Sequence, residues 1–207
     1  MSVASLTNST AITASNSDTA SKIVDDGTRK ILVPQNRLSA LKKEWVSIYE
    51  PVVSHLKLQI RFNTKIRSVE IRNSPETSNP GYLQKAADFI RAFGLGFSVK
   101  DAIAILRVED MFLESFHIRD VKSLGGEHLS RAIGRLAGKD GKTRIAIENA
   151  SKTRVIIADA NIHILGSYSN IRIAKDAIMN LILGSTPGKV YNQLRNTVSR
   201  IKEKGGI

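Results

Sequence analysis

Hydrophobic residues in the second half of the chain change their spacing several times, and each change predicts a new element. Some segments place them at every second residue or in short β-branched runs, which is typical of strands. Others place them at i, i+3, i+4 and i+7, or carry no helix breaker, which is typical of helices. The predicted strands lie at 112–120, 154–158 and 162–166, and the predicted helices at 129–136, 142–150 and 169–183.

Two glycines separate the first two of these helices. They bound the turn Gly138-Lys139-Asp140-Gly141, which Lys142 follows. Glycine at each end lets a nucleic-acid backbone pass close to the chain, because no side chain blocks its approach. The second helix begins at the same place, so its free N–H groups and positive dipole end face the phosphates. The order strand, helix, GXXG loop, helix, strand, strand, helix is typical of a type I KH domain, whose loop clamps four nucleotides of RNA.

Further residues near this loop are candidates for RNA contact. Arg135, Lys152 and Arg154 carry the nearest further charges, and we expect them to contact phosphates rather than to read bases. Ile145 and Val155 would form an apolar floor for the bases, although both also fit an ordinary core. The predicted RNA-binding residues are Arg135, Gly138, Lys139, Asp140, Gly141, Lys142, Ile145, Lys152, Arg154 and Val155.

The first half of the chain shows a related pattern. An extended segment and a helix, which we expect Pro51 to end, precede two strands and another helix. The block of strand, turn, strand and helix resembles 154–183, which indicates a weak internal repeat and hence two KH-like units. The predicted elements are an extended segment at 31–34, helices at 37–49 and 83–93, strands at 55–62 and 66–72, and a linking helix at 97–107.

The first unit cannot carry a GXXG loop in its core. No glycine occurs between Glu50 and Gly81, so its expected role is protein contact or a rigid platform. Trp45, the only tryptophan, is expected to pack in the core or between the units. The basic residues of this unit form either a solvated sheet face or a contact surface for RNA or protein. These residues are Lys57, Arg61, Lys65, Arg67 and Arg72.

We therefore predict an α+β fold with two tandem KH-like units of type I. Residues 1–30 are rich in Ser, Thr, Ala and Asn without a hydrophobic period, which is typical of a disordered tail. The last segment forms a basic amphipathic helix, whose docking site is its own domain, a partner or nucleic acid. The predicted segments are the tail at 1–30, the degenerate KH-like unit with its linking helix at 31–108, the KH domain with the GXXG loop at 109–186, and the C-terminal helix at 187–207.

Composition narrows the class of protein. The 207 residues carry a formal charge of +12, and from Arg131 onward Lys and Arg outnumber Asp and Glu by more than two to one. This places basic surface in and after the GXXG unit, where RNA would bind. The chain has no cysteine, which excludes a disulfide scaffold, a zinc ribbon and a thiol nucleophile. No apolar run approaches the ~20 residues of a membrane span, so we expect no membrane association.

No motif predicts catalysis. The sequence Gly141-Lys142-Thr143 resembles the end of a P-loop, but that motif needs a glycine at the position of Leu136 and a strand before the loop. The four histidines show no metal-ligand spacing, and no Gly-x-Ser-x-Gly elbow occurs. We therefore predict a protein that is not an enzyme and has no metal or cofactor.

Several motifs together resemble one family. They are the segments Gly134–Thr143, Ala146–Ala150, Ile162–Gly166 and Leu181–Ser185, the last followed by Pro187–Tyr191. In this combination they are similar to the eukaryotic partner-of-Nob family, KH proteins that assemble the small ribosomal subunit. The resemblance runs from about Ile31 to the C-terminus. The first KH unit of that family also lacks the GXXG motif, which agrees with the glycine-free stretch described above.

The resemblance implies partners that the residues alone do not show. They are single-stranded pre-rRNA near the 3′ end of the small-subunit rRNA, the Nob-type endonuclease that cuts there, and the pre-small-subunit particle. The implied location is the nucleolus and nucleus, with transfer to the cytoplasm on the particle. By matching positions, Gly138, Lys139, Asp140 and Gly141 form the RNA clamp. Two other hypotheses stay open, a protein-binding scaffold with a vestigial clamp and a KH regulator of messenger RNA.

Overall fold

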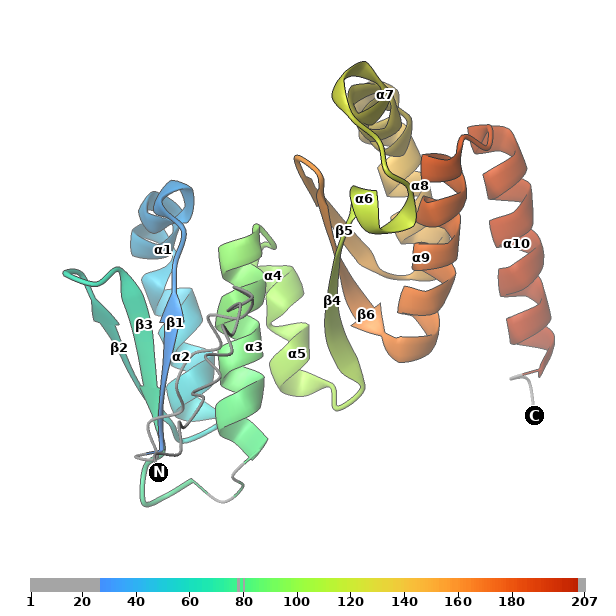
Figure 1. The fold of residues 1–207 in the computed structure, drawn as a ribbon. Coiled ribbons are helices and arrows are strands. Elements are labelled where there is room, and N and C mark those ends of the chain that lie inside the picture. The colour runs from blue at the N-terminus through green and yellow to red at the C-terminus, as the bar shows by residue number, and fades with distance from the viewer. Residues whose placement is uncertain (1–26, 78, 80, 205–207) are drawn as a thin grey trace, which may run out of the picture.

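The protein consists of two halves, each with a three-stranded antiparallel sheet that helices cover on one face (Figure 1). A computed structural model describes residues 27–77, 79 and 81–204, apart from the side chains of Lys202 and Lys204. The two hydrophobic cores are separate clusters, one for each half. The sequence prediction of an α+β fold is therefore confirmed.

The first half follows the order strand, helix, helix, strand, strand, helix. Its elements are β1 (Thr28–Leu32), the 3₁₀ turn η1 (Gln35–Arg37), α1 (Leu38–Lys43), α2 (Trp45–Ser54), β2 (Gln59–Asn63), β3 (Ser68–Arg72) and α3 (Gly81–Leu95). Strand β3 pairs with both neighbours, so the sheet order is β1-β3-β2. The predicted inner face of α3 is confirmed, because Leu83, Ala86, Ile90 and Phe93 are all buried.

Pro51 does not end a helix, so that prediction is wrong. The predicted helix at 37–49 is divided at Glu44, and α2 then continues through Pro51. A proline inside a helix removes one backbone hydrogen bond, at a cost of about 3 kcal/mol. Ile48 and Val52 are both fully buried in the core, and each contributes about 1.5–3 kcal/mol by burial. Tertiary packing therefore outweighs the local cost of the proline.

The starts of the strands also differ from the prediction. Strand β1 begins at Thr28, so the predicted disordered tail 1–30 is wrong for its last residues, and residues 1–26 lie outside the described residues. Strands β2 and β3 begin a few residues later than predicted. Leu56 and Leu58 are nevertheless buried, because the irregular segment before β2 packs against the same core as the strand.

The predicted linking helix at 97–107 consists of two short helices, α4 (Val99–Ala102) and α5 (Ala104–Arg107). The side chain of Ser98 caps α4 by accepting a hydrogen bond from the backbone N–H of Asp101 at 3.1 Å. Both helices lie between α3 and the second sheet (Figure 1). The first core includes Leu165 of that sheet, so apolar side chains join the two halves.

The second half repeats the strand order of the first. Its elements are β4 (Met111–His117), α6 (Ile118–Val121), α7 (Gly126–Ala137), the 3₁₀ turn η2 (Lys139–Gly141), α8 (Lys142–Ser151), β5 (Arg154–Ala158), β6 (Asn161–Ser167), α9 (Tyr168–Leu183) and α10 (Pro187–Lys204). Strand β6 lies between β4 and β5, and both pairings are antiparallel. All six elements predicted here from hydrophobic spacing are present, but the strand predicted at 112–120 ends at His117, and Ile118 begins the short helix α6.

The C-terminal helix α10 docks on its own half. Val190 and Leu194 are buried members of the second core, and the helix lies beside α9 (Figure 1). Gly184 ends α9 in the left-handed conformation with φ +111°, and Pro187 occupies the first position of α10, where its missing N–H costs nothing. Of the three docking sites considered for this helix, the structure shows its own domain.

Candidate nucleic-acid interface

The GXXG loop joins the end of α7 to the start of α8 through three residues of positive φ. Gly138 has φ +71° and ψ 175°, and Asp140 and Gly141 have φ +55° and +73°. The ψ of Gly138 places it in a region that is essentially restricted to glycine. Aspartate tolerates the left-handed conformation better than most residues. The loop is therefore a sharp turn that the residue types at 138, 140 and 141 permit.

The two glycines of the loop have different surroundings. A Cβ atom on Gly138 would lie 2.2 Å from Thr143 Oγ1 and 2.9 Å from the backbone nitrogen of Thr143. A Cβ atom on Gly141 would meet nothing closer than 3.8 Å. The protein itself therefore excludes a side chain at position 138. At position 141 the space above the loop is open, as the approach of an RNA backbone requires.

The start of α8 offers positive charge and free backbone donors. Lys139, Asp140 and Lys142 are exposed, and no side chain caps the N-terminus of α8 at Gly141. The first N–H groups of a helix have no partner within the helix, and the helix dipole makes this end positive. Together the lysines and the free N–H groups can hold phosphate oxygens. Asp140 lies between the two lysines in the sequence.

Ile145 and Val155 have different positions, although both were predicted as an apolar floor. The side chain of Ile145 is 42% exposed, and its Cδ1 would lie 3.9 Å from a Cβ atom on Gly141. Val155 is only 3% exposed and belongs to the second core. The structure therefore places Ile145 beside the loop as an accessible apolar surface, and it places Val155 beneath the surface.

The three further cations that were predicted do not gather at the loop. Arg135 donates from Nε to the backbone oxygen of Leu181 at 3.3 Å, so it is directed toward α9. Lys152 lies at the opposite end of α8 from the loop. Arg154 donates from Nε to the carboxylate of Asp101 in α4 at 2.9 Å, and this hydrogen bond raises the pKa of the guanidinium. Their contact with RNA stays a prediction.

Sequence reasoning missed a group of side chains that connects α8 to β5. Arg144 Nη1 donates to Glu148 Oε1 at 3.0 Å and to the backbone oxygen of Val155 at 3.4 Å. The same Glu148 oxygen accepts a hydrogen bond from the Val155 N–H at 2.8 Å. The i, i+4 spacing of Arg144 and Glu148 on a predicted helix was visible in the sequence. The contact that both side chains make with the backbone of Val155 on β5 was not visible in the sequence.

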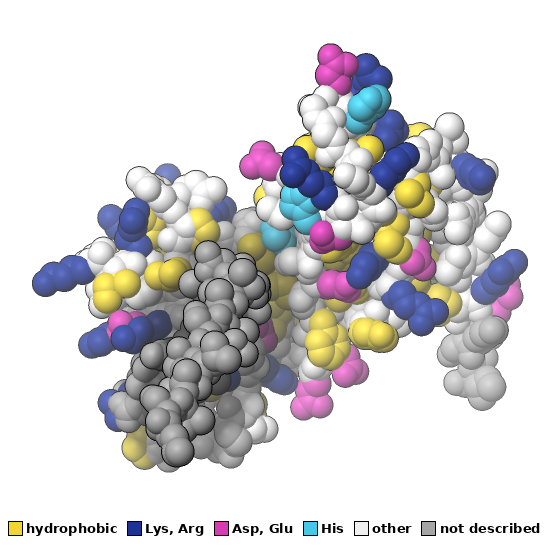
Figure 2. All heavy atoms as spheres, viewed as in Figure 1, with side chains coloured by type: hydrophobic (Ala, Val, Ile, Leu, Met, Phe, Trp, Pro, Cys, Tyr) yellow, Lys and Arg dark blue, Asp and Glu magenta, His cyan; other side chains and the backbone are white. Residues whose placement is uncertain are grey.

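Basic side chains are spread over both halves rather than gathered in one stripe (Figure 2). Net charge therefore does not locate an RNA site by itself. In the part of the chain that the structure describes, no group of three or more His, Cys, Asp or Glu residues is arranged to hold a metal ion. No described helix combines the length and the hydrophobicity that are needed to cross a membrane.

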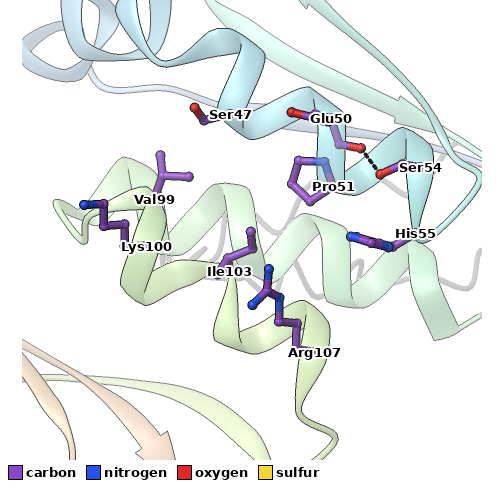
Figure 3. A pocket seen from close by; sticks show the side chains of 9 residues that line it. All are labelled: Ser47, Glu50, Pro51, Ser54, His55, Val99, Lys100, Ile103 and Arg107. Atoms are coloured by element: carbon purple, nitrogen blue, oxygen red, sulfur yellow. Dashed lines mark hydrogen bonds between the residues drawn. The ribbon is translucent and has the colours of Figure 1, made fainter.

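A separate hollow of about 600 Å³ lies in the first half, between α2 and the helices α4 and α5 (Figure 3). His55 at the end of α2 and Arg107 of α5 extend into it, next to the apolar side chains of Pro51 and Ile103. Glu50 contributes a carboxylate to the same lining. The hollow contains no residue of the GXXG loop, and we assign it no part in the clamp.

Comparison with known proteins identifies the family. The eukaryotic-type KH domain (KH-domain type I) matches residues 115–199. A protein of Dictyostelium discoideum named RNA-binding protein pno1 is 61% identical over 176 residues, which are 85% of this chain and 74% of that protein. The chain belongs to the PNO1 family. The PNO1 protein of Schizosaccharomyces pombe, named a pre-rRNA-processing protein, is 57% identical over 85% of this chain and 73% of its own length. The resemblance inferred from the motifs is confirmed.

An archaeal structure is similar to this chain over both halves. It is described as an a/eIF2alpha-aDim2p-rRNA complex from Pyrococcus horikoshii, with 29% sequence identity and a TM-score of 0.73. The likeness covers 84% of this chain and 94% of that chain. The type I KH domain predicted for the second half is thus confirmed. The interpretation of the first half as a KH-like unit and the predicted domain boundaries stay predictions, although both PNO1 halves have the same strand order.

Proposed function

We propose that this protein binds single-stranded pre-rRNA through the segment Gly138–Lys142, as an assembly factor of the small ribosomal subunit. One observation carries the proposal: a glycine-bounded turn opens onto an uncapped helix N-terminus beside exposed lysines and the exposed Ile145. Such a surface suits a ligand with a phosphate backbone and apolar base faces. The names of the PNO1 relatives and the rRNA in the archaeal complex favour rRNA over messenger RNA.

The finer part of the proposal concerns place and partner. We infer that the RNA lies near the 3′ end of the small-subunit rRNA and that the protein works with a Nob-type endonuclease on the pre-small-subunit particle. The protein would hold the cleavage region in a fixed single-stranded path, so that it is either masked from the nuclease or presented to it. The particle would carry it from the nucleolus and nucleus to the cytoplasm. Support for these steps is the resemblance of the motifs to the family.

The decisive experiment compares two charge reversals of the same kind. Lys139→Asp places a second acid in the loop, whereas Lys42→Asp changes an exposed lysine of α1 in the first half. Binding to a single-stranded RNA with the 3′-end sequence of the small-subunit rRNA is measured across a salt series. We expect Lys139→Asp to lower the affinity about tenfold or more and to reduce the salt dependence by about one ion. Lys42→Asp should change the affinity far less.

The result separates the clamp from the alternatives. Equal binding by Lys139→Asp and wild type would show that the loop is not the RNA site, and the scaffold hypothesis would then lead. A preference for unrelated messenger sequences would favour a regulator of messenger RNA. If the clamp holds, purified Nob-type endonuclease is added to the complex, and a rise or a fall in cleavage tells whether the protein presents or masks the site.

A further inference from the structure

The guanidinium of Arg144 spans the distance between the GXXG loop and the edge of strand β5. Its Nη1 atom bonds Glu148 and the backbone oxygen of Val155. Its Nη2 atom lies near the loop, because a Cβ atom on Gly141 would be 3.8 Å from it. An RNA whose phosphates rest on the loop would direct its bases toward this side chain and toward the neighbouring Ile145.

Glu148 holds the guanidinium in place. Its side chain is buried, and its Oε1 atom accepts hydrogen bonds from both Arg144 and the Val155 N–H. The outward N–H and C=O of Val155 are thus both bound by side chains of α8. A base that enters at this point cannot pair with the strand edge at Val155. It meets the guanidinium of Arg144 in place of the backbone.

One side of the guanidinium is still available to a ligand. The side chain of Arg144 is 37% exposed, and within the described part of the chain its hydrogen bonds all come from Nη1. An arginine plane can stack on a base, and its N–H groups donate to base acceptors. Aromatic residues, which provide stacking surfaces in many RNA-binding domains, make up only 5% of this chain. Arg144 and Ile145 together supply such a surface.

We propose that Arg144 selects the base that follows the clamped phosphate. This inference rests on the proposed function of the loop. The base lies edge-on to the guanidinium, so that a carbonyl oxygen of the base accepts a hydrogen bond from Nη2, while the exposed side chain of Ile145 contacts the face of the base. Adenine is the only one of the four bases without a carbonyl oxygen, so it can offer this donor only a ring nitrogen. The site therefore favours cytosine, uracil or guanine at one position of the bound RNA and disfavours adenine there.

The test uses Arg144→Lys, which keeps the charge but removes the plane and its second donor nitrogen. Arg131→Lys is the matched control, because Arg131 forms an i, i+4 pair with Glu127 on the exposed face of α7. Each protein is titrated with a set of single-stranded RNAs of the 3′-end sequence in which one nucleotide at a time is replaced by adenosine. Salt dependence is measured in parallel.

Wild type should show one position at which adenosine weakens binding about tenfold, the size of one good base contact. In Arg144→Lys this penalty should disappear while the salt dependence stays the same, since the charge is kept. Arg131→Lys should retain the penalty. A flat profile in wild type, or an unchanged profile in Arg144→Lys, would overturn the inference. If Lys139→Asp still loses binding in that case, the clamp stands and only the role of Arg144 fails.

A second measurement uses wild-type protein and therefore tests the proposal even if Arg144→Lys does not fold. The side-chain Nε–H resonances of Arg144 and Arg131 are followed in wild-type protein during titration with the preferred RNA. A shift of the Arg144 resonance that saturates with binding, while the Arg131 resonance stays in place, supports the proposal. An Arg144 resonance that does not move contradicts it.

Discussion

The two halves of this PNO1-family protein share a strand order but differ at the last helix junction between their first and second strands. In the first half, α1 and α2 are joined at Glu44 alone. In the second half, the turn from Gly138 to Gly141 separates α7 from α8 and exposes the N-terminus of α8. The same strand order thus occurs with and without a GXXG loop. The residues at one junction, rather than the strand order, decide which half exposes the N-terminus of a helix beside two glycines.

The halves also differ in the elements that come after the sheet-covering helices α3 and α9. In the second half, α10 packs against the domain and buries Val190 and Leu194. In the first half, the chain turns into α4 and α5, which leave the hollow beside α2 and pack toward the second sheet (Figure 3). The half with the clamp is therefore closed by its own helix. The half without it uses the same part of the chain to join the two units.

The largest expected effect tests the junction itself. Gly138→Ala should lower the free energy of unfolding by about 4 kcal/mol, because the glycine-only conformation and the clash with Thr143 add to each other. Gly141→Ala should cost only about 1 kcal/mol, since its left-handed conformation is the only strain. Urea unfolding followed by circular dichroism measures both. Equal losses would show that the two glycines do not differ as the structure indicates.

A smaller effect is expected from the contact that closes the second half. Leu194→Ala should lower the free energy of unfolding by about 2–3 kcal/mol, because this side chain is buried between α10 and the core. Ile201→Ala, on the exposed end of the same helix, should change stability by less than about 0.5 kcal/mol. Thermal unfolding of the two variants measures this difference in stability. A stable Leu194→Ala would mean that α10 contributes little to the half that it covers.

The clamp half was predicted from the sequence more completely than the first half, for a physical reason. Its helices and strands have clear hydrophobic periods, and glycines mark its turns. In the first half, the tertiary burial of Ile48 and Val52 carries a helix through Pro51, which no local pattern shows. Local helix propensity is a weak guide where the burial of neighbouring side chains outweighs the cost of an unfavourable residue.

Of the candidate site residues, the structure brings together those of the loop and Ile145, and it places Arg135, Lys152 and Arg154 elsewhere. The alternation of a strand would have placed Arg154 and Val155 on opposite faces, and the structure indeed turns one to Asp101 and the other to the core. The partner of Arg154 lies on the far side of a seam between the halves, so only the assembled fold reveals it. Arg144 was overlooked because its role depends on the edge of β5, which lies beside α8 only after folding.

The smallest expected effect is a dependence of stability on pH that arises in the second half. His163 on β6 is buried, and its Nδ1 lies 2.7 Å from Ser115 Oγ. Burial lowers the pKa of His163 below its usual 6.5, because the charged ring would lose its hydration. His55 of the first half is exposed. Protonation of His163 should therefore weaken the second half.

The sign of the pH dependence is set by the lowered pKa. Below pH 6.5 the unfolded chain binds a proton at His163 that the folded protein does not bind, so stability falls as the pH decreases toward the folded pKa. Urea midpoints are measured between pH 7.5 and about 5 for wild type, His163→Gln and His55→Gln. The decline should be absent in His163→Gln and unchanged in His55→Gln. Parallel curves for wild type and His163→Gln would show that burial of this ring does not set the acid sensitivity of the clamp half.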